Sequence, residues 1–132
     1  MKKYIGTKVI MAEPMTMTEA QKVLGRELKP ATVEEDGYLV EYNDGYKSWS
    51  PKSIFDEAYK PYNDFIDRLH IERDELKERV EKFNAFIREG FDELQQKGVS
   101  ARQAALLIIQ GDAMVRYLEA IETRIELMEE NK

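Results

Sequence analysis

The sequence contains no cysteine and only one histidine, His70, among its 132 residues. Without thiols there can be no disulfide, no thiolate metal site and no cysteine nucleophile. His70 lies one helical turn before Asp74, a spacing that could begin a metal site, but no second histidine or thiol accompanies the pair. We therefore predict no metal and no cofactor, and interpret His70 as part of a solvated helix face.

Catalytic signatures are also missing. The sequence has no GxSxG, no phosphate-binding loop of the P-loop type and no GxGxxG. Its many carboxylates lie in charged helical segments, where pairing with neighbouring lysine and arginine side chains explains them more simply than acid–base catalysis does. We predict that the protein is not an enzyme.

Strong basic charge and long apolar runs are absent too. The formal net charge is −6, which opposes non-specific binding to nucleic acid. No apolar run has the length of a membrane span. The basic start "MKKYIGTKVIMAEPM" lacks the apolar stretch of a signal peptide. These features are typical of a soluble cytoplasmic protein with neither nucleic acid nor membrane as a partner.

The pattern of the first part, residues 1–60, predicts a small α+β module. Residues 2–12 have the β-branched and aromatic composition of a strand, and Thr16 with Glu19 forms a capping box for a short helix. Asn43–Gly45 separates two alternating segments, which indicates a β-hairpin. Ser50 is expected to cap the helix that follows, with Pro51 as its first residue.

Residues 61–132 have the pattern of a long antiparallel helical hairpin. Asn63 is expected to cap a first helix that ends at Gly90, and a capping box at Ser100 begins a second helix. The fold class is therefore α+β: a small antiparallel sheet with short helices, followed by the hairpin. The second helix carries a seam with heptad spacing: Leu107, Gly111, Met114, Leu118, Ile121, Ile125 and Met128.

The second helix has more apolar surface than one partner helix can cover. Leu106, Ile108 and Ile109 lie off the seam, so they must meet either the amino-terminal module or another subunit. We predict a homo-oligomer, a dimer or higher, with the hairpin as its oligomerisation unit. The predicted interface residues are Leu106, Leu107, Ile109, Met114, Leu118, Ile121 and Ile125.

Two sets of residues are candidates for contact with a ligand or partner protein. Tyr46 and Trp49 could stack on a base or nucleotide, although packing of a small sheet against the next helix explains them more simply. Arg102 and Arg116 could line a polar pocket between subunits, although solvated arginines are the simpler interpretation. Arg102 near a helix start opposes the helix dipole, which hints at a role.

Two segments resemble phage proteins. "KYIGTKVIMAEPMT" with "GYLVEYNDGYKSWSPKSIFDEAY" resembles an amino-terminal module of small bacteriophage and prophage proteins. One carboxy-terminal part found after that module belongs to a Thoeris anti-defence family, and its sequence is absent here. "RLHIERDELKERVEKFNAFI" with "GDAMVRYLEAIETRI" resembles a helical-hairpin family of crAss-like phages with no assigned function. The resemblance implies a phage or prophage origin and an accessory role in the host cytoplasm.

Two functions follow as hypotheses. The first is a non-catalytic inhibitor of bacterial anti-phage defence that binds either an immune nucleotide signal or a defence protein such as a CRISPR effector. Its general shape is similar to that of phage sponges for cyclic nucleotides, by architectural analogy. The alternative is a phage structural or assembly protein that uses the hairpin to oligomerise.

Overall fold

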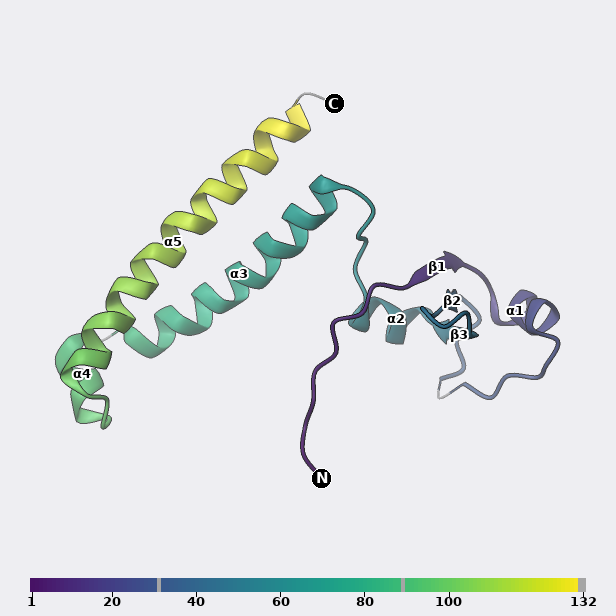
Figure 1. Ribbon diagram of the computed structural model, residues 1–132, viewed down its shortest axis with the longest axis horizontal. Coiled ribbons are helices and arrows are strands. Elements are labelled where there is room, and N and C mark those ends of the chain that lie inside the picture. Colours follow the sequence, from purple (N-terminus) through teal and green to yellow (C-terminus); the bar gives the residue numbers. More distant parts are fainter. Residues whose placement is uncertain (31, 89, 131–132) are drawn as a thin grey trace. The chain divides into compact units, whose positions relative to one another are not determined.

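The computed structural model describes residues 1–30, 32–88 and 90–130. The chain divides into two compact units, Met1–Lys60 and Pro61–Lys132. Figure 1 shows a small sheet with two short helices in the first unit and a pair of long helices in the second. The predicted α+β class, with a small antiparallel sheet followed by a long helical region, is confirmed.

The sheet of the first unit has three antiparallel strands in the order β1-β2-β3. They are β1 (Met11–Pro14), β2 (Gly37–Glu41) and β3 (Lys47–Pro51). The prediction of a strand over residues 2–12 was wrong for most of its length. β2 provides partners only for Met11–Pro14, and upstream side chains such as Tyr4 are almost fully exposed. A strand-like composition does not form a strand where no neighbouring backbone is available for pairing.

The hairpin between β2 and β3 forms where Asn43–Gly45 predicted it. The Tyr42 amide donates to the Tyr46 carbonyl over 2.9 Å, and Gly45 has a φ of 88°. That left-handed conformation is open to glycine without strain. β2 is buried on both faces, because Val40 and Leu39 are both almost inaccessible to solvent. The first unit therefore has a core on each side of its central strand.

Two short helices flank this sheet, α1 (Met17–Leu24) and α2 (Lys52–Ala58). The predicted cap at Thr16 is confirmed, since its hydroxyl accepts from the Glu19 amide over 3.2 Å. The predicted cap at Ser50 was wrong. Ser50 and Pro51 belong to β3, where they pair with β2, and α2 begins one residue later. The start of α2 is therefore set by the pairing of β3 with β2 and not by the local capping signal at Ser50.

Two consecutive glutamates hold the starts of both short helices. The Glu35 carboxylate accepts from the Thr18 amide over 2.8 Å, and Glu34 accepts from the Ser53 amide over 3.0 Å and from its hydroxyl. Free amides at a helix start favour a negative charge. The loop before β2 is thus tied to α1 and α2 by adjacent residues.

These contacts make the first unit sensitive to acid. Hydrogen bonds from Ser53 and Thr18 lower the pKa of Glu34 and Glu35, respectively, below the ordinary value of 4.5. A lowered pKa adds stability above the unfolded pKa, and that stability is lost as pH falls through the folded pKa. We expect the urea midpoint of the first unit to decrease when the pH is lowered past about 4.5. A double Glu34→Gln, Glu35→Gln variant should show a smaller decrease of its urea midpoint over the same pH range. An unchanged acid dependence in that variant would contradict this assignment.

The second unit is an antiparallel helical hairpin made of α3 (Phe65–Ile87), α4 (Phe91–Gln96) and α5 (Ala101–Glu130). Figure 1 shows α3 and α5 running side by side, with the short α4 at their connection. The predicted cap at Asn63 was wrong by one residue. Asp64 accepts from the Asp67 amide over 2.8 Å, and a carboxylate at this position also complements the helix dipole.

The core of the hairpin lies between α3 and α5. It consists of five buried side chains with four partly buried ones against them, and the seam expected on α5 supplies two of the five. Gly111 brings the helices close near α4, because a Cβ there would lie 2.7 Å from Cδ1 of Ile87. The five buried residues are Leu69, Leu76, Val80, Ile121 and Ile125.

No helix within the described part of the chain combines the length and the apolar character that crossing a membrane requires.

Candidate functional site

The two aromatic candidates of the first unit lie in different environments. The Trp49 indole is 7% exposed, and its N–H donates to the Met15 carbonyl over 2.7 Å. Tyr46 is 53% exposed, lies beneath the Arg26 guanidinium at 5.5 Å and accepts a hydrogen bond from it over 3.1 Å. Trp49 thus contributes to the fold of the sheet, and Tyr46 is the accessible member of the pair. A ligand role for either residue stays a prediction.

The two arginine candidates both lie exposed on α5. Arg116 forms an ion pair with Asp112 over 3.2 Å, one helical turn away. An exposed pair of this kind contributes less than about 1 kcal/mol, so Arg116 can turn to another anion at little cost. Arg102 lies in the first turn of α5. Both arginines belong to the second unit, whereas Tyr46 and Trp49 belong to the first.

Six of the seven predicted interface residues separate into two groups within the single chain, and the seventh, Leu107, is partly buried. Ile121 and Ile125 are buried against α3, and Met114 and Leu118 pack on the same core. Leu106 and Ile109 remain 51% and 65% exposed. Only the second group has a large area left for another subunit.

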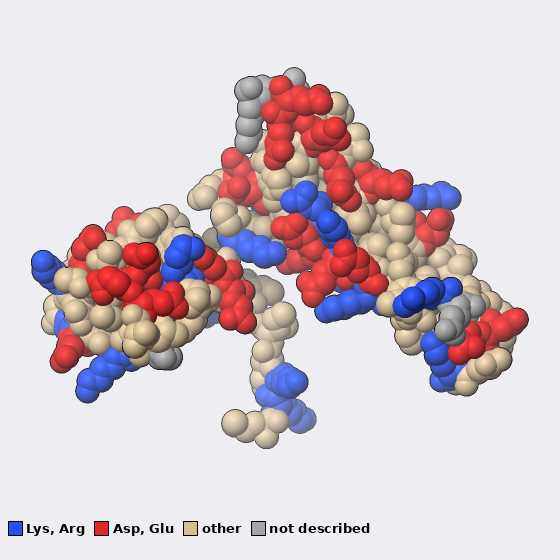
Figure 2. Space-filling model, turned by 180° about the vertical axis from the view of Figure 1, so that it is seen from behind, with Lys and Arg blue, Asp and Glu red and all other residues tan. Residues whose placement is uncertain are grey.

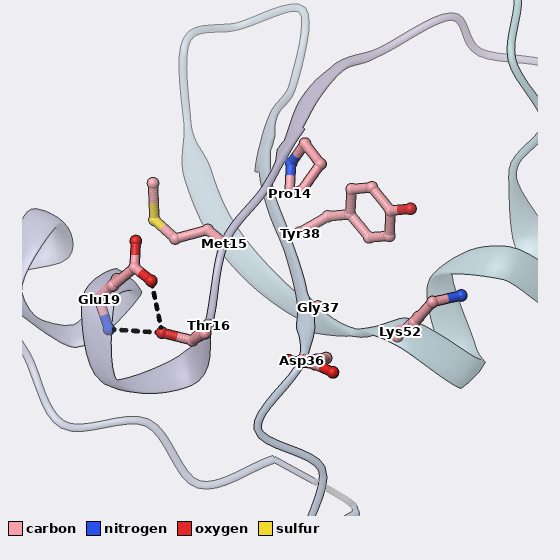
Figure 3. Close-up of a pocket in the computed structure, with 8 residues that line it drawn as sticks. All are labelled: Pro14, Met15, Thr16, Glu19, Asp36, Gly37, Tyr38 and Lys52. Atoms are coloured by element: carbon pink, nitrogen blue, oxygen red, sulfur yellow. Dashed lines mark hydrogen bonds between the residues drawn. The ribbon is translucent and has the colours of Figure 1, made fainter.

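The first unit has a hollow of about 350 Å³ beside α1 and β2. Figure 3 shows its lining residues, with Thr16 and Glu19 joined by the hydrogen bonds of the helix cap. Lys52 is paired with Asp56 on its own helix. The polar groups of this hollow that could hold a ligand are thus largely used by local structure.

The second unit has a groove of about 440 Å³ between α3 and α5. Phe83 and Phe86 of α3 and Tyr117 of α5 supply its aromatic walls. Phe86 and Tyr117 are 45% and 49% exposed, so much of each ring faces solvent. The remaining lining residues are apolar, polar or cationic: Leu76, Arg79, Lys82, Gln110 and Met114.

Positive charge gathers beside these aromatic rings. Arg79 and Lys82 line the groove, and the Lys97 ammonium lies 5.8 Å from the Phe86 ring centroid. Lys82 is paired with Glu78 over 2.8 Å, and this contact raises the pKa of Lys82. Elsewhere acidic side chains are prominent; Figure 2 shows them gathered where α5 ends. Aromatic rings with cations at their edges suit a ligand that combines a planar ring with negative charge.

The sequence patterns did not identify this groove. Phe86 and Tyr117 lie just beside the apolar seams of their helices, and neither belonged to the predicted site. The available signal was that both are large aromatics at half-exposed flanking positions, where an amphipathic helix usually carries polar residues. Residues on α3 and α5 come together only when the helical hairpin forms. The spacing of residues within one helix does not show which residues of the other helix lie beside them.

His70 has a structural role in the hairpin. Its Nε2 lies 2.8 Å from the Glu129 carboxylate on α5, and its Nδ1 lies 3.1 Å from the Arg73 guanidinium. The ring therefore connects α3 with the end of α5. Within residues 1–30, 32–88 and 90–130, no group of three or more potential metal ligands is found.

The second unit is therefore a packed pair of helices with an aromatic and cationic groove along one side. Residues 63–127 match the family Sequestin. The matched segment is just under half of the chain and contains every residue that lines the groove. The name of the family denotes sequestration, which is binding rather than catalysis. No curated protein and no solved structure matches the chain.

Proposed function

We propose that this protein is a phage-encoded, non-catalytic binding protein that sequesters a small anionic ring compound in the groove of its hairpin. The ligand class we infer is a nucleotide signal of bacterial anti-phage defence, taken up in the host cytoplasm. The observation that carries this proposal is that the Sequestin match spans the segment that forms the aromatic and cationic groove. The resemblance of the amino-terminal module to phage proteins supports the phage origin.

The groove offers each interaction that a nucleotide requires. A base can stack on Phe86 or Tyr117, which contributes about 1–3 kcal/mol per stacked base. Arg79 can donate two parallel hydrogen bonds to a phosphate, and Gln110 has both a donor and an acceptor for a base edge. These groups bind and orient a ligand, and they include no activated nucleophile. We therefore expect that the bound ligand undergoes no reaction and is released with its chemical structure unchanged.

The test is a comparison of two tyrosines with similar exposure. Using isothermal titration calorimetry with a panel of cyclic mono- and dinucleotides, we expect Tyr117→Ala to weaken binding by about 5- to 150-fold, the loss of one stacking contact. Tyr46→Ala is the matched control, because Tyr46 is 53% exposed but lies in the other unit. It should leave affinity unchanged.

Three results would overturn the proposal. If the wild-type protein binds no member of the panel and carries no small molecule when purified from infected cells, the ligand is not a nucleotide signal. If a bound nucleotide is recovered in altered form after heat denaturation, the protein acts on its ligand rather than sequestering it. Loss of binding in Tyr46→Ala but not in Tyr117→Ala would move the site to the first unit.

A further inference from the structure

An exposed apolar stripe runs along α5 beside the groove. Leu106, Ala113, Ala120 and Leu127 repeat at heptad spacing, so they lie on one face of the helix. All four are exposed, with Leu106 at 51% and Leu127 at 55%. Ile109, at 65%, lies beside them. Exposed apolar surface of this length on a soluble chain marks an interaction site.

The stripe is complementary to itself in the antiparallel direction. If two copies of α5 pack with their centres between Arg116 and Tyr117, then Leu106 faces Leu127 and Ala113 faces Ala120 of the other copy. The small residues at the centre permit close approach of the helices, and the large ones pack at both ends. At the centre, Arg116 of one copy meets the ring of Tyr117 of the other, a favourable cation–π pair.

The face of α3 that carries Arg79 and Phe86 repeats the same symmetry with charges. Antiparallel pairing about a centre between Glu75 and Leu76 places Phe65 opposite Phe86 and Glu72 opposite Arg79. The two phenylalanines are 47% and 45% exposed, so both have area to bury. The charged pair has opposite signs. A like-charge arrangement there would oppose this pairing.

The two stripes belong to one face of the hairpin and to one level along it. The Arg124 guanidinium, one turn beyond Ala120, lies 5.6 Å from the ring centroid of Phe65. This contact places both stripes on the same side. The two centres also lie close together, because Leu76 and Tyr117 line the same groove. A single two-fold axis can therefore relate both pairs of helices at once.

We propose that two copies of this chain stack face to face, with α5 on α5 and α3 on α3, each pair antiparallel, and that each copy closes the groove of the other. The interface is isologous, as in most homodimers. It converts two thin hairpins into a four-helix bundle, an arrangement that commonly holds ligands in its core.

The second copy also completes the ligand site, a part of the inference that rests on the proposed function. The groove of one hairpin is an open surface, and small-molecule sites usually bury roughly 70–90% of their ligand. In the stacked arrangement, Arg68 and Arg124 of the second copy, which flank its Phe65, lie opposite Phe86. The closed site then gains two further cations for an anionic ligand, while Glu72 of the second copy engages part of the Arg79 guanidinium.

The first test is the mass of the protein in solution without ligand. Light scattering after size exclusion should give twice the 15.4 kDa of one chain. Glu72→Arg and Arg79→Glu should each weaken the dimer at least tenfold, and the double variant should restore it, because the swap recreates opposite charges. Ile109→Lys should dissociate the dimer, because this register places position 109 opposite Arg124 of the other copy, whereas Ile108→Lys, on the other side of α5, should not. A monomeric wild type, or no rescue by the double variant, would refute the interface.

The second test uses the absence of native cysteine, which removes any background cross-linking. A mixture of Ala113→Cys and Ala120→Cys chains should form a disulfide-linked dimer under mild oxidation. Ala113→Cys alone should not, because the two copies of this position lie about 10 Å apart along the helices. Efficient cross-linking of Ala113→Cys with itself would contradict the antiparallel register.

These measurements separate the inference from the proposed function. A dimer with the expected cross-link that binds no nucleotide would support the interface and overturn the proposed ligand. A monomer that binds nucleotide through Tyr117 would support the proposed function and overturn the shared site.

Discussion

A Gly37→Ala variant is expected to lose most of the stability of the first unit. A Cβ at this position would lie 2.2 Å from the Ser50 carbonyl oxygen and 2.5 Å from Cζ2 of Trp49. Neither group can move freely, because Ser50 is paired with β2 and the Trp49 ring is buried with its N–H bonded to Met15. Overpacking against backbone of this kind costs about 3 kcal/mol or more.

Tryptophan fluorescence can follow this loss without a contribution from the second unit, because Trp49 is the one tryptophan in the chain. The urea midpoint of the Trp49 signal should fall sharply in Gly37→Ala. The matched control is Gly6→Ala, since a Cβ at Gly6 meets nothing within 4 Å. Equal midpoints for wild type and Gly37→Ala would show that β3 can move away from β2, contrary to the close packing described above.

The second large effect is expected in the hairpin core. Ile121 is 1% exposed and belongs to a cluster of only five buried residues. Truncation to alanine removes its contacts and leaves a cavity that two helices cannot easily close, at a cost of about 2–5 kcal/mol. A small core has little reserve, so Ile121→Ala should substantially reduce helical circular dichroism at moderate urea.

The control for this variant is Ile108→Ala on the same helix. Ile108 is 37% exposed, so the same change removes less buried surface and should cost about 1 kcal/mol or less. Thermal unfolding followed at the helical wavelength compares the two. Similar losses for both variants would mean that Ile121 does not hold α3 and α5 together to the extent that its burial indicates.

Local chemistry predicted much of the fold. The caps at Thr16 and Ser100 are both present, since their hydroxyls accept from amides three residues later, over 3.2 Å in each case. The β-hairpin at Gly45 also forms where the turn residues indicated. These features depend on contacts within a few residues, which a sequence displays directly.

The errors arose where distant backbone decides the outcome. The first strand was placed too early because only β2 determines which residues pair, and the cap at Ser50 was displaced because β3 extends through Pro51. The roles of Glu34 and Glu35 depend on helices that lie before and after their loop. The groove depends on α3 and α5 meeting in one register, which the seam of α5 predicted only in part.

Gly111 controls the distance between α3 and α5 in the helical hairpin. Its missing side chain lets α5 settle against Ile87 and Phe83, and Phe83 is also a wall of the groove. Gly111 therefore sets the spacing of α3 and α5 at that end, and with it the width of the groove. It does so without having to contact a ligand in the groove. Related chains with alanine or serine at this position would have more widely spaced helices, and so would accept a larger ligand with every contact residue left in place.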